Sequence, residues 1–419
     1  MRTIIIGSGF TGLLTASKIP GSIVISENIG GLIRSNEKNG FSFDFGGHVY
    51  TPDDDNVNDL MHDIGAAFHS QRKAYYDVQR RVPYPVQDHA HELGLTISPI
   101  RDSVEDGSLS SFFFNKFGQD FTNNFLIPFN KRVWSTDPSQ MSDDWVNGRV
   151  KKPREATKAW GMNSSFWYAK GQSIIQYLQL KAHKNDAIFV NGQVIEINNK
   201  DRIVKVRNGR IVDNFKYDAL IDTTGRFMGE RTNEVLSIGI GLRKSFEGQP
   251  FHWIYPDLKS DVHRVTLLSR YAPNMAPTGC DSFLLEVPYM NTSELPHWAK
   301  YLLIYGNHTS VKLRAAAEKG LLDAGFTNDQ VNSMSISTVW ASTSKGYPVQ
   351  TLGCRKRVGM RKFVFAKQRI FSIGRWGSHL YANLQHLYKD VDSLLKFGND
   401  PSDEEARSNY FDSAFYYGG

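Results

Sequence analysis

The first 27 residues constrain the fold more than any other part of the chain. Thr3-Ile4-Ile5-Ile6 is a β-branched, apolar run, which is typical of a buried parallel strand. It leads directly into Gly7-Ser8-Gly9-Phe10-Thr11-Gly12, and an apolar helical stretch follows until Pro20. Ser22-Ile23-Val24-Ile25-Ser26 is then a second predicted strand, with Glu27 at its end. This order of strand, glycine loop, helix, strand and acid predicts a dinucleotide-binding βαβ unit.

Each residue of this unit has a physical role. Gly7 allows the tight turn, Gly9 lets backbone N–H groups approach a diphosphate, and Gly12 lets the helix pack closely on the strand. The N-terminus of the helix attracts the phosphate charge, and Glu27 can accept hydrogen bonds from a ribose. The alternative is a glycine-rich turn in an ordinary α/β unit. We expect an α/β fold with a Rossmann-type dinucleotide-binding domain, an inserted helical domain and an antiparallel β-sheet domain.

Composition narrows the class of protein. A chain of 419 residues is too long for one core, so two or three domains are expected. The net charge of +6 comes without a dense Lys/Arg run, which argues against nucleic acid and for a cleft that takes a small anion. The two cysteines, Cys280 and Cys354, form no metal-binding pattern and no disulfide framework. No apolar run reaches membrane-spanning length and no cleavage site follows the apolar start, so we expect a cytoplasmic protein with no bound metal and no membrane contact.

Two glycine pairs follow the first unit. Gly30-Gly31-Leu32-Ile33-Arg34-Ser35 fits a loop that covers a cofactor diphosphate, with Arg34 as the counter-charge. In Phe43-Asp44-Phe45-Gly46-Gly47-His48, Gly46 and Gly47 would bring the backbone close to a flat group such as a flavin ring, with His48 beside it. A core histidine that is satisfied by backbone groups is the alternative reading of His48.

The rest of the chain divides by its periodicity. Residues 187–197 and 203–206 are predicted strands around an Asn191-Gly192 turn. Residues 217–225 are predicted to form a strand that closes in Thr-Thr-Gly, where the backbone would meet the cofactor again. Residues 108–150 are predicted to be helical. Within residues 233–345, the runs 236–242, 264–268 and 283–287 alternate with period two, as in an antiparallel sheet, and a helix is predicted over roughly 309–324. The predicted domains are 1–75, 165–230 and 346–398 for FAD, 76–164 as a mainly helical insertion, 231–345 as the substrate sheet and 399–419 as a loose tail. The basic stretch 151–166 is a candidate loop that closes over the substrate.

Several further blocks are more specific. They are Val82-Pro83-Tyr84-Pro85-Val86-Gln87, Phe251-His252-Trp253-Ile254-Tyr255, Arg264-Val265-Thr266-Leu267-Leu268-Ser269-Arg270-Tyr271, Gly346-Tyr347-Pro348 and Gly374-Arg375-Trp376-Gly377-Ser378-His379-Leu380-Tyr381. Taken in order, from Ile4 to about Leu395, these blocks resemble the UDP-galactopyranose mutases. The resemblance is to the eukaryotic-type branch of that family, within the flavin amine-oxidase-like superfamily.

The resemblance implies roles for individual residues. The catalytic residues would be Arg264, Arg375 and His48, with the two arginines on the substrate diphosphate and His48 next to the flavin. Contacts to the uracil would come from Tyr84 and Gln87, further nucleotide contacts from Asn130, Trp134 and Arg149, and other substrate contacts from Trp253, Tyr255, Tyr271, Tyr347 and Tyr381. The expected cofactor contacts are Gly7, Gly9, Phe10, Thr11, Gly12, Glu27, Gly31, Leu32, Arg34, Ser35, Gly46, Gly47, Val194, Thr224, Gly374, Arg375, Asn383 and Leu384.

The resemblance also implies an activity. Such an enzyme interconverts UDP-galactopyranose and UDP-galactofuranose through an adduct between the sugar and N5 of reduced FAD, and NAD(P)H is a candidate reductant. Three alternatives stay open: an FAD-dependent oxidase of the amine-oxidase or protoporphyrinogen-oxidase type, a mutase for another UDP-sugar such as UDP-arabinopyranose, and a non-catalytic flavoprotein that binds nucleotide sugars or nucleic acid. The two arginines and three tyrosines expected around one anion favour the mutase.

Overall fold

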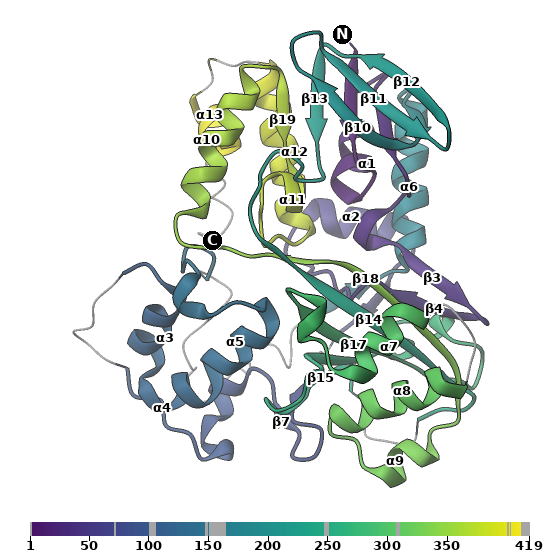
Figure 1. Cartoon of the computed structure of the whole chain (residues 1–419), viewed down its shortest axis with the longest axis vertical. Coiled ribbons are helices and arrows are strands. Elements are labelled where there is room, and N and C mark those ends of the chain that lie inside the picture. Colours follow the sequence, from purple (N-terminus) through teal and green to yellow (C-terminus); the bar gives the residue numbers. More distant parts are fainter. Residues whose placement is uncertain are drawn as a thin grey trace.

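The structure of the chain is a computed structural model that describes residues 2–70, 73–99, 106–146, 150, 165–246, 251–306, 311–399, 402 and 404–411. A parallel sheet with its helices occupies one end of the molecule, and a larger, mostly antiparallel sheet occupies the other (Figure 1). The expected α/β fold, with both kinds of sheet, is confirmed. Within the described ranges, no helix is long and apolar enough to cross a membrane.

The parallel sheet is built around the first strand, in the order β19-β13-β1-β2-β9. Ile5 packs on one face with helix α1 (Phe10–Ala16), whereas Ile4 and Ile6 pack on the other, because successive side chains of a strand alternate. Helices α6 and α12 complete the cover of the first face. The bounds of these elements are β1 Thr3–Ile6, β2 Ile23–Ser26, β9 Ile188–Asn191, β13 Ala219–Asp222, β19 Ile370–Ser372, α6 Gly171–Lys184 and α12 Leu384–Asn399.

A small antiparallel sheet covers the second face. It consists of β10 (Gln193–Asn198), β11 (Ile203–Asn208) and β12 (Ile211–Lys216), in that order (Figure 1). The predicted turn at Asn191-Gly192 is wrong, because β9 pairs with β2 in the parallel sheet and β10 pairs with β11 in the small one. The Asn-Gly pair therefore carries the chain from one sheet to the other.

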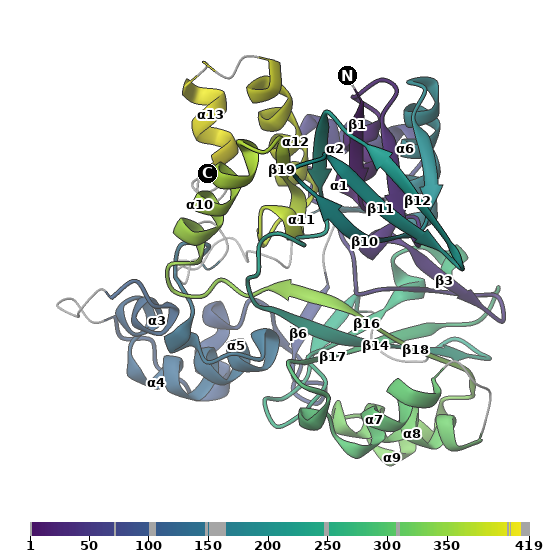
Figure 2. The ribbon, with the colours of Figure 1, turned by 45° about the horizontal axis from the view of Figure 1, so that its top comes forward.

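The large sheet has the order β18-β14-β17-β16-β15-β6-β7, and its central pairs are antiparallel as predicted. Its strands are β6 Ala74–Tyr76, β7 Val82–Pro83, β14 Thr232–Leu242, β15 Trp253–Tyr255, β16 Arg264–Leu267, β17 Ser282–Tyr289 and β18 Ile336–Pro348. Helices α7 (His297–Tyr305), α8 (Val311–Asp323) and α9 (Asn328–Ser333) cover the face that is turned away from the parallel sheet (Figure 2).

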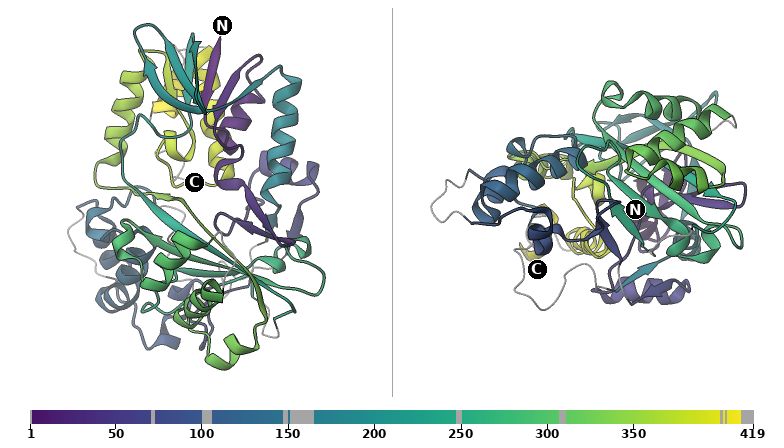
Figure 3. Two further views of the ribbon diagram at one scale, coloured as in Figure 1. Left: turned by 45° about the vertical axis from the view of Figure 1, so that its right-hand side comes forward. Right: turned by 90° about the horizontal axis from the view of Figure 1, so that it is seen from below.

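The opposite face of the large sheet receives a hairpin of β3 (Ser35–Lys38) and β4 (Phe41–Asp44). Gly239 and Gly241 of β14 lie directly under Phe43 and Phe41, and a Cβ at either glycine would overlap the ring. These two glycines thus bring the hairpin, and the loop that follows it, close to the sheet. In Figure 3, left, the hairpin (purple) lies between the two sheets.

Strands β6 and β7 still belong to the large sheet. A mainly helical segment begins after β7. It contains the 3-10 helix η2 (Val86–Leu93), α3 (Leu109–Phe117), α4 (Gln119–Phe121), the π-helix η3 (Thr122–Leu126), α5 (Ile127–Trp134) and the 3-10 helix η4 (Pro138–Gln140). Its core is a row of phenylalanines four residues apart, whose successive rings lie 5.2 to 6.5 Å apart: Phe113, Phe117, Phe121, Phe125 and Phe129. The domain boundaries given above remain a proposal.

The prediction of a loose tail is wrong for residues 404–411. They form helix α13 (Glu404–Phe411), which packs against α10 (Cys354–Ala366) and α12. Tyr410 is fully buried, and its ring stacks on Phe397 with the centroids 5.2 Å apart. Tyr410 and Phe411 thus contribute to the core. Residues 412–419 lie outside the described ranges.

The remaining elements are short. Helix α2 (Asp55–Asp63) contacts α12, and β5 (Ala67–His69) pairs with β8 (Phe166–Tyr168). Helix α11 (Gly374–Gly377) follows β19 directly. The 3-10 turns are η1 Gly31–Ile33, η5 Leu268–Arg270, η6 Pro273–Met275 and η7 Thr292–Glu294.

Candidate active site

The turn between β1 and α1 has the shape expected of a diphosphate cradle. Gly7 has a φ of 96°, and a Cβ there would lie 2.5 Å from Thr223 Oγ1. A Cβ on Gly12 would overlap the carbonyl of Gly7, so the helix can approach the strand only with glycine at this position. Gly9 faces Gly31: a Cβ added to Gly9 would lie 3.9 Å from the Cα of Gly31. The backbone at the start of α1 is therefore left open to a ligand.

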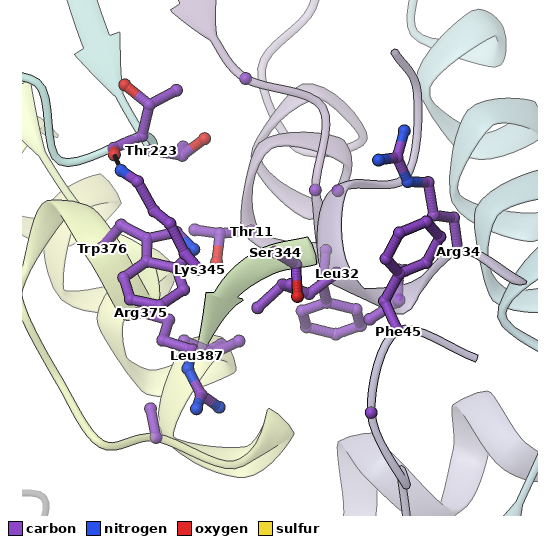
Figure 4. A pocket seen from close by; sticks show the side chains of 18 of the residues that line it. Thr11, Leu32, Arg34, Phe45, Thr223, Ser344, Lys345, Arg375, Trp376 and Leu387 are labelled. Carbon is purple, nitrogen blue, oxygen red and sulfur yellow. Dashed lines mark hydrogen bonds between the residues drawn. The ribbon is translucent and has the colours of Figure 1, made fainter. Parts of the chain in front are cut away.

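This cradle opens into a cavity of about 700 Å³. The cavity reaches from the end of β2 to β16, β17 and β18 of the large sheet, so both sheets contribute to its wall. Figure 4 shows Arg34 and Phe45 on one side and Arg375, Trp376 and Lys345 on the other. The expected cofactor residues in its lining are Gly7, Gly9, Phe10, Thr11, Glu27, Gly31, Leu32, Arg34, Gly46, Gly47, Val194, Thr224, Arg375, Asn383 and Leu384.

Three expected cofactor residues do not line the cavity. Gly12 is enclosed between α1 and β1, and Ser35 donates its hydroxyl to Asp44 Oδ1 at 2.6 Å. Gly374 packs against Thr11, where a Cβ would lie 2.5 Å from Thr11 Oγ1. Their expected contacts with the cofactor stay predictions, and in the structure these three residues shape the walls around the cavity.

Arg34 is suited to a buried anion. Its guanidinium lies 4.5 Å from the centre of the Phe45 ring, and its Nε is buried without a hydrogen-bond partner within the described part of the chain. Burial lowers the pKa of Arg34, because the charged form has lost water. A diphosphate bound on the glycine cradle would supply the missing negative charge and acceptor. The glycines and Arg34 together fit a dinucleotide such as FAD.

At the other end of the cavity, Arg264 is paired with Glu286. Arg264 Nε and Nη2 lie 2.5 and 3.0 Å from Oε2 and Oε1 of Glu286, and Nη2 also donates to the carbonyl of Gly47 at 3.3 Å. Burial alone would lower the pKa of Arg264, but the Glu286 carboxylate raises it above its usual value. The planar guanidinium is thus fixed in one orientation at the cavity wall.

Arg375 lies in the same cavity, among aromatic rings. Its Nη2 donates to the carbonyl of Gly346 at 3.0 Å, and its Cζ lies 5.4 and 5.8 Å from the ring centres of Tyr347 and Tyr381. Burial raises the pKa of Tyr347 more than the nearby Arg264 lowers it, so the phenol keeps its proton. Two guanidinium groups and two phenols therefore line one part of the cavity.

His48 lies beside both arginines. Burial, and then the positive charges of Arg375 and Arg264, lower the pKa of His48 to about 4. The imidazole is consequently neutral at pH 7 and can both accept and donate a hydrogen bond.

Two residues that were expected to contact the substrate, Tyr271 and Trp253, are buried away from the cavity. Tyr271 is 1% exposed, its ring stacks on Tyr168 at 4.9 Å, and its carbonyl pairs with His69 Nε2. Trp253 is buried in the same aromatic cluster. The expected direct contacts of Tyr271 and Trp253 with the substrate are therefore corrected, because both side chains are part of the core.

The expected nucleotide contacts lie behind Tyr347 and Tyr381. The ring of Trp134 is 5.4 and 5.0 Å from these two rings, and its Nε1 donates to Asn130 Oδ1 at 3.3 Å. The amide of Asn130 in turn donates to the carbonyl of Leu126 at 2.8 Å. Trp134 and Asn130 thus support the tyrosines from the helical segment.

The proposed uracil contacts of Tyr84 and Gln87, and the proposed substrate contact of Tyr255, stay predictions. The rings of Tyr84 and Tyr255 lie 4.6 Å apart, and Gln87 lies on η2, but none of the three lines the cavity. Arg149 and most of the expected closing loop, residues 151–164, lie outside the described residues.

Sequence reasoning missed three charged residues of the cavity, namely Arg226, Glu286 and Lys345. Arg226 Nη2 donates to the carbonyl of Val194 at 2.6 Å. Glu286 was visible as the only acid in the apolar run Phe283-Leu284-Leu285-Glu286-Val287, where an unpaired charge would be costly. Lys345 precedes Gly346 on β18 and donates to the carbonyl of Thr224 at 3.1 Å, so it links the two sheets across the cavity.

Comparisons with known proteins agree with this fold. Residues 5–64 match a family model described as an NAD(P)-binding Rossmann-like domain. A curated relative, protoporphyrinogen oxidase 2 of Arabidopsis thaliana, is 25% identical over 255 residues, which are 47% of this chain and 50% of the relative. The chain thus spans about half the length of the curated relative that it matches.

Solved structures extend the likeness to the whole chain. A reduced UDP-galactopyranose mutase superposes with a TM-score of 0.82 at 22% identity, over 100% of this chain and 99% of the other. The cyclohexylamine oxidase of Brevibacterium oxydans superposes with a TM-score of 0.56 at 12% identity, over 91% of this chain and 94% of the other. At these identities the likeness shows a common fold, of which both a mutase and oxidases are examples.

Proposed function

We propose that the protein is a flavin-dependent UDP-galactopyranose mutase that interconverts UDP-galactopyranose and UDP-galactofuranose. One observation carries the proposal: Arg264, Arg375, Tyr347, Tyr381 and His48 line the same cavity as a glycine cradle for a dinucleotide. An oxidase that acts on an amine or a porphyrin has no need for this arrangement beside its flavin. The full-length likeness to a mutase supports the same choice.

The cofactor is proposed to be FAD. The cradle around Gly9 and the guanidinium of Arg34 would hold its diphosphate, and Glu27 would accept hydrogen bonds from its ribose. When bound and reduced, FAD supplies the nucleophile that displaces UDP from C1 of the sugar. NAD(P)H is proposed as the reductant.

The chain itself would bind the diphosphate of the substrate. Arg375 and Arg264 would donate charge-assisted hydrogen bonds to its oxygens, and the hydroxyls of Tyr347 and Tyr381 would add two donors. Since Glu286 already compensates the charge of Arg264, Arg375 is the cation that we expect to bind the phosphate more strongly. These donors stabilise the charge that develops on UDP as it leaves and keep UDP in place for its return.

His48 would act through its neutral imidazole. With a pKa of about 4, it does not add a third positive charge beside the two arginines. It can instead orient the reacting groups by hydrogen bonding, and the arginines keep their full attraction for the diphosphate.

The deciding experiment compares the two redox states of the protein. FAD-loaded protein is incubated with UDP-galactofuranose under anaerobic conditions, with and without dithionite, and UDP-galactopyranose is followed by chromatography. Turnover only in the reduced state supports the mutase, and an Arg375→Ala variant should lose it. No turnover in either state refutes the proposal.

Because the fold also resembles that of oxidases, oxidase activity should be tested in parallel. Oxygen consumption with an amine or with protoporphyrinogen, without conversion of any UDP-sugar, would identify an oxidase. Conversion of UDP-arabinopyranose in preference to UDP-galactopyranose would keep the reaction and change the sugar.

A further inference from the structure

A buried carboxylate outside the cavity holds the backbone next to Arg375. Asp390, on α12, is fully buried. Its Oδ2 accepts hydrogen bonds from the backbone N–H of Gly374 and, at 2.7 Å, from the hydroxyl of Ser378. These two donors lie at the start of α11 and directly after its end. One carboxylate oxygen thus ties both ends of the short helix that carries Arg375.

The charge of Asp390 is balanced by a second buried group. Lys362 of α10 is also fully buried, and its Nζ lies 3.8 Å from Asp390 Oδ1. The same Nζ donates to the carbonyl of Tyr410 on α13 at 2.8 Å and lies 4.4 Å from the centre of the Tyr410 ring. A buried ion pair adds little net stability over apolar side chains of the same size. We therefore attach more weight to the position in which Lys362 holds Asp390 than to its effect on stability.

Helix α11 is also held by close backbone contacts. Gly374 has a φ of 83°, and a Cβ there would lie 2.5 Å from Thr11 Oγ1 on α1. A Cβ on Gly377 would lie 2.5 Å from the carbonyl of Asp222 at the end of β13. These close contacts leave the backbone of α11 little freedom to move. The hydrogen bond from the Gly374 N–H to Asp390 restricts it further.

We propose that Asp390 is a positioning residue for Arg375, and that it directs the guanidinium into the cavity by fixing α11. Lys362 and the carbonyl of Tyr410 keep Asp390 in place, so that the C-terminal helix α13 supports the anion-binding site. The inference rests on the proposed function for the identity of the anion, UDP. The tie between Asp390 and α11 does not depend on that function.

The first experiment measures the tie itself. Hydrogen exchange of the backbone is followed by mass spectrometry in FAD-loaded wild type, Asp390→Asn and Ser378→Ala. We expect faster exchange in peptides that cover residues 374–378 in both variants. Asp392→Asn is the matched control, since Asp392 lies on the same helix and pairs with Lys18 at the surface. Unchanged exchange in 374–378 in the variants would overturn the inference.

The second experiment measures the consequence for the ligand. UDP binding to the reduced holoenzyme is measured by calorimetry for Asp390→Asn, Ser378→Ala, Arg375→Ala and the double variants. The amide oxygen of asparagine is a neutral and weaker acceptor than the Asp390 carboxylate, so both hydrogen bonds to α11 are weakened, and we expect the Kd of UDP to rise roughly tenfold in Asp390→Asn. In the Arg375→Ala background the same change should have less than about a twofold effect, because the residue being positioned is gone.

The outcomes separate a positioning role from a merely structural one. The positioning role is overturned if Asp390→Asn raises the Kd of UDP by the same factor in the Arg375→Ala background as in wild type. It is also overturned if the Kd of the Asp390→Asn single variant stays at the wild-type value. If Asp390→Asn does not fold, Ser378→Ala decides by the same two criteria. Wild type that fails to bind UDP refutes the proposed function and with it the role in UDP binding, whereas hydrogen exchange still decides whether Asp390 holds α11.

Discussion

Replacing Arg375 by lysine isolates the geometry of the guanidinium from its charge. In the structure, Nη2 of Arg375 is oriented by the Gly346 carbonyl at 3.0 Å, and the group lies 5.4 Å from the centre of the Tyr347 ring. Lysine keeps the positive charge but cannot reproduce the planar fork that binds two oxygens at once. The expected loss is one charge-assisted hydrogen bond, about 1.5 to 3 kcal/mol. This corresponds to a Kd for UDP that is about 10 to 150 times higher.

Calorimetric titration of UDP into the reduced, FAD-loaded protein measures this loss. Arg314→Lys is the matched control, because Arg314 lies on α8, outside the cavity, and pairs with Glu318 at 2.9 Å. A Kd for Arg375→Lys within about threefold of wild type would refute the assignment of Arg375 as the main phosphate ligand. An equal loss in Arg314→Lys would show that the assay does not report on the cavity.

Three further predictions follow from the structure. Gly12→Ala should abolish retention of FAD, seen as loss of the flavin absorption in purified protein, because its Cβ would overlap the Gly7 carbonyl; a yellow variant contradicts this. His48, with a pKa of about 4 when folded and about 6.5 when unfolded, takes up its proton first in the unfolded state, so stability falls as the pH drops through this window, by at most about 3 kcal/mol. In urea unfolding of the apoprotein, His48→Gln should lose less stability than wild type between pH 7 and pH 4, and an equal loss argues against the buried neutral imidazole. Tyr410→Ala should lower the free energy of unfolding by about 3 kcal/mol, since a fully buried aromatic ring is removed; a change under about 0.5 kcal/mol would restore the view of a loose tail.

The parts of the fold that follow local rules could be predicted from the sequence. The β1–α1 turn needs glycine at positions 7 and 12, for a turn and for a close approach, and both needs are visible in the spacing alone. The alternation at residues 236–242, 264–268 and 283–287 likewise predicted β14, β16 and β17, because successive side chains of a strand point to opposite faces of the sheet.

Features that depend on distant partners could not be predicted in this way. Asn191-Gly192 has the composition of a hairpin turn, but β9 finds its partner in β2, far earlier in the chain. The tail is polar in composition, yet Tyr410 enters a core whose other residues precede it.

In the candidate site, too, some residue positions could be predicted from the local sequence and others could not. Arg375 and Tyr381 lie close together in the sequence and reach the cavity as expected, whereas Tyr271 shares a block with Arg264 but points into the core. Arg264 lies on β16, whereas Tyr271 follows the 3-10 turn η5, where the chain has left the strand, so a block can match while one of its residues faces away from the site. Glu286 was missed because its importance comes from its pairing with Arg264 across neighbouring strands.

The central claim is that a dinucleotide cradle and a pair of guanidinium groups face one cavity that is filled by FAD and a UDP-sugar. A crystal structure of the reduced protein with FAD and UDP tests it most directly. We predict phosphate oxygens of UDP within about 3.2 Å of guanidinium nitrogens of Arg375, and FAD bound in the same cavity. UDP bound away from Arg264 and Arg375, or a flavin outside this cavity, would contradict the account.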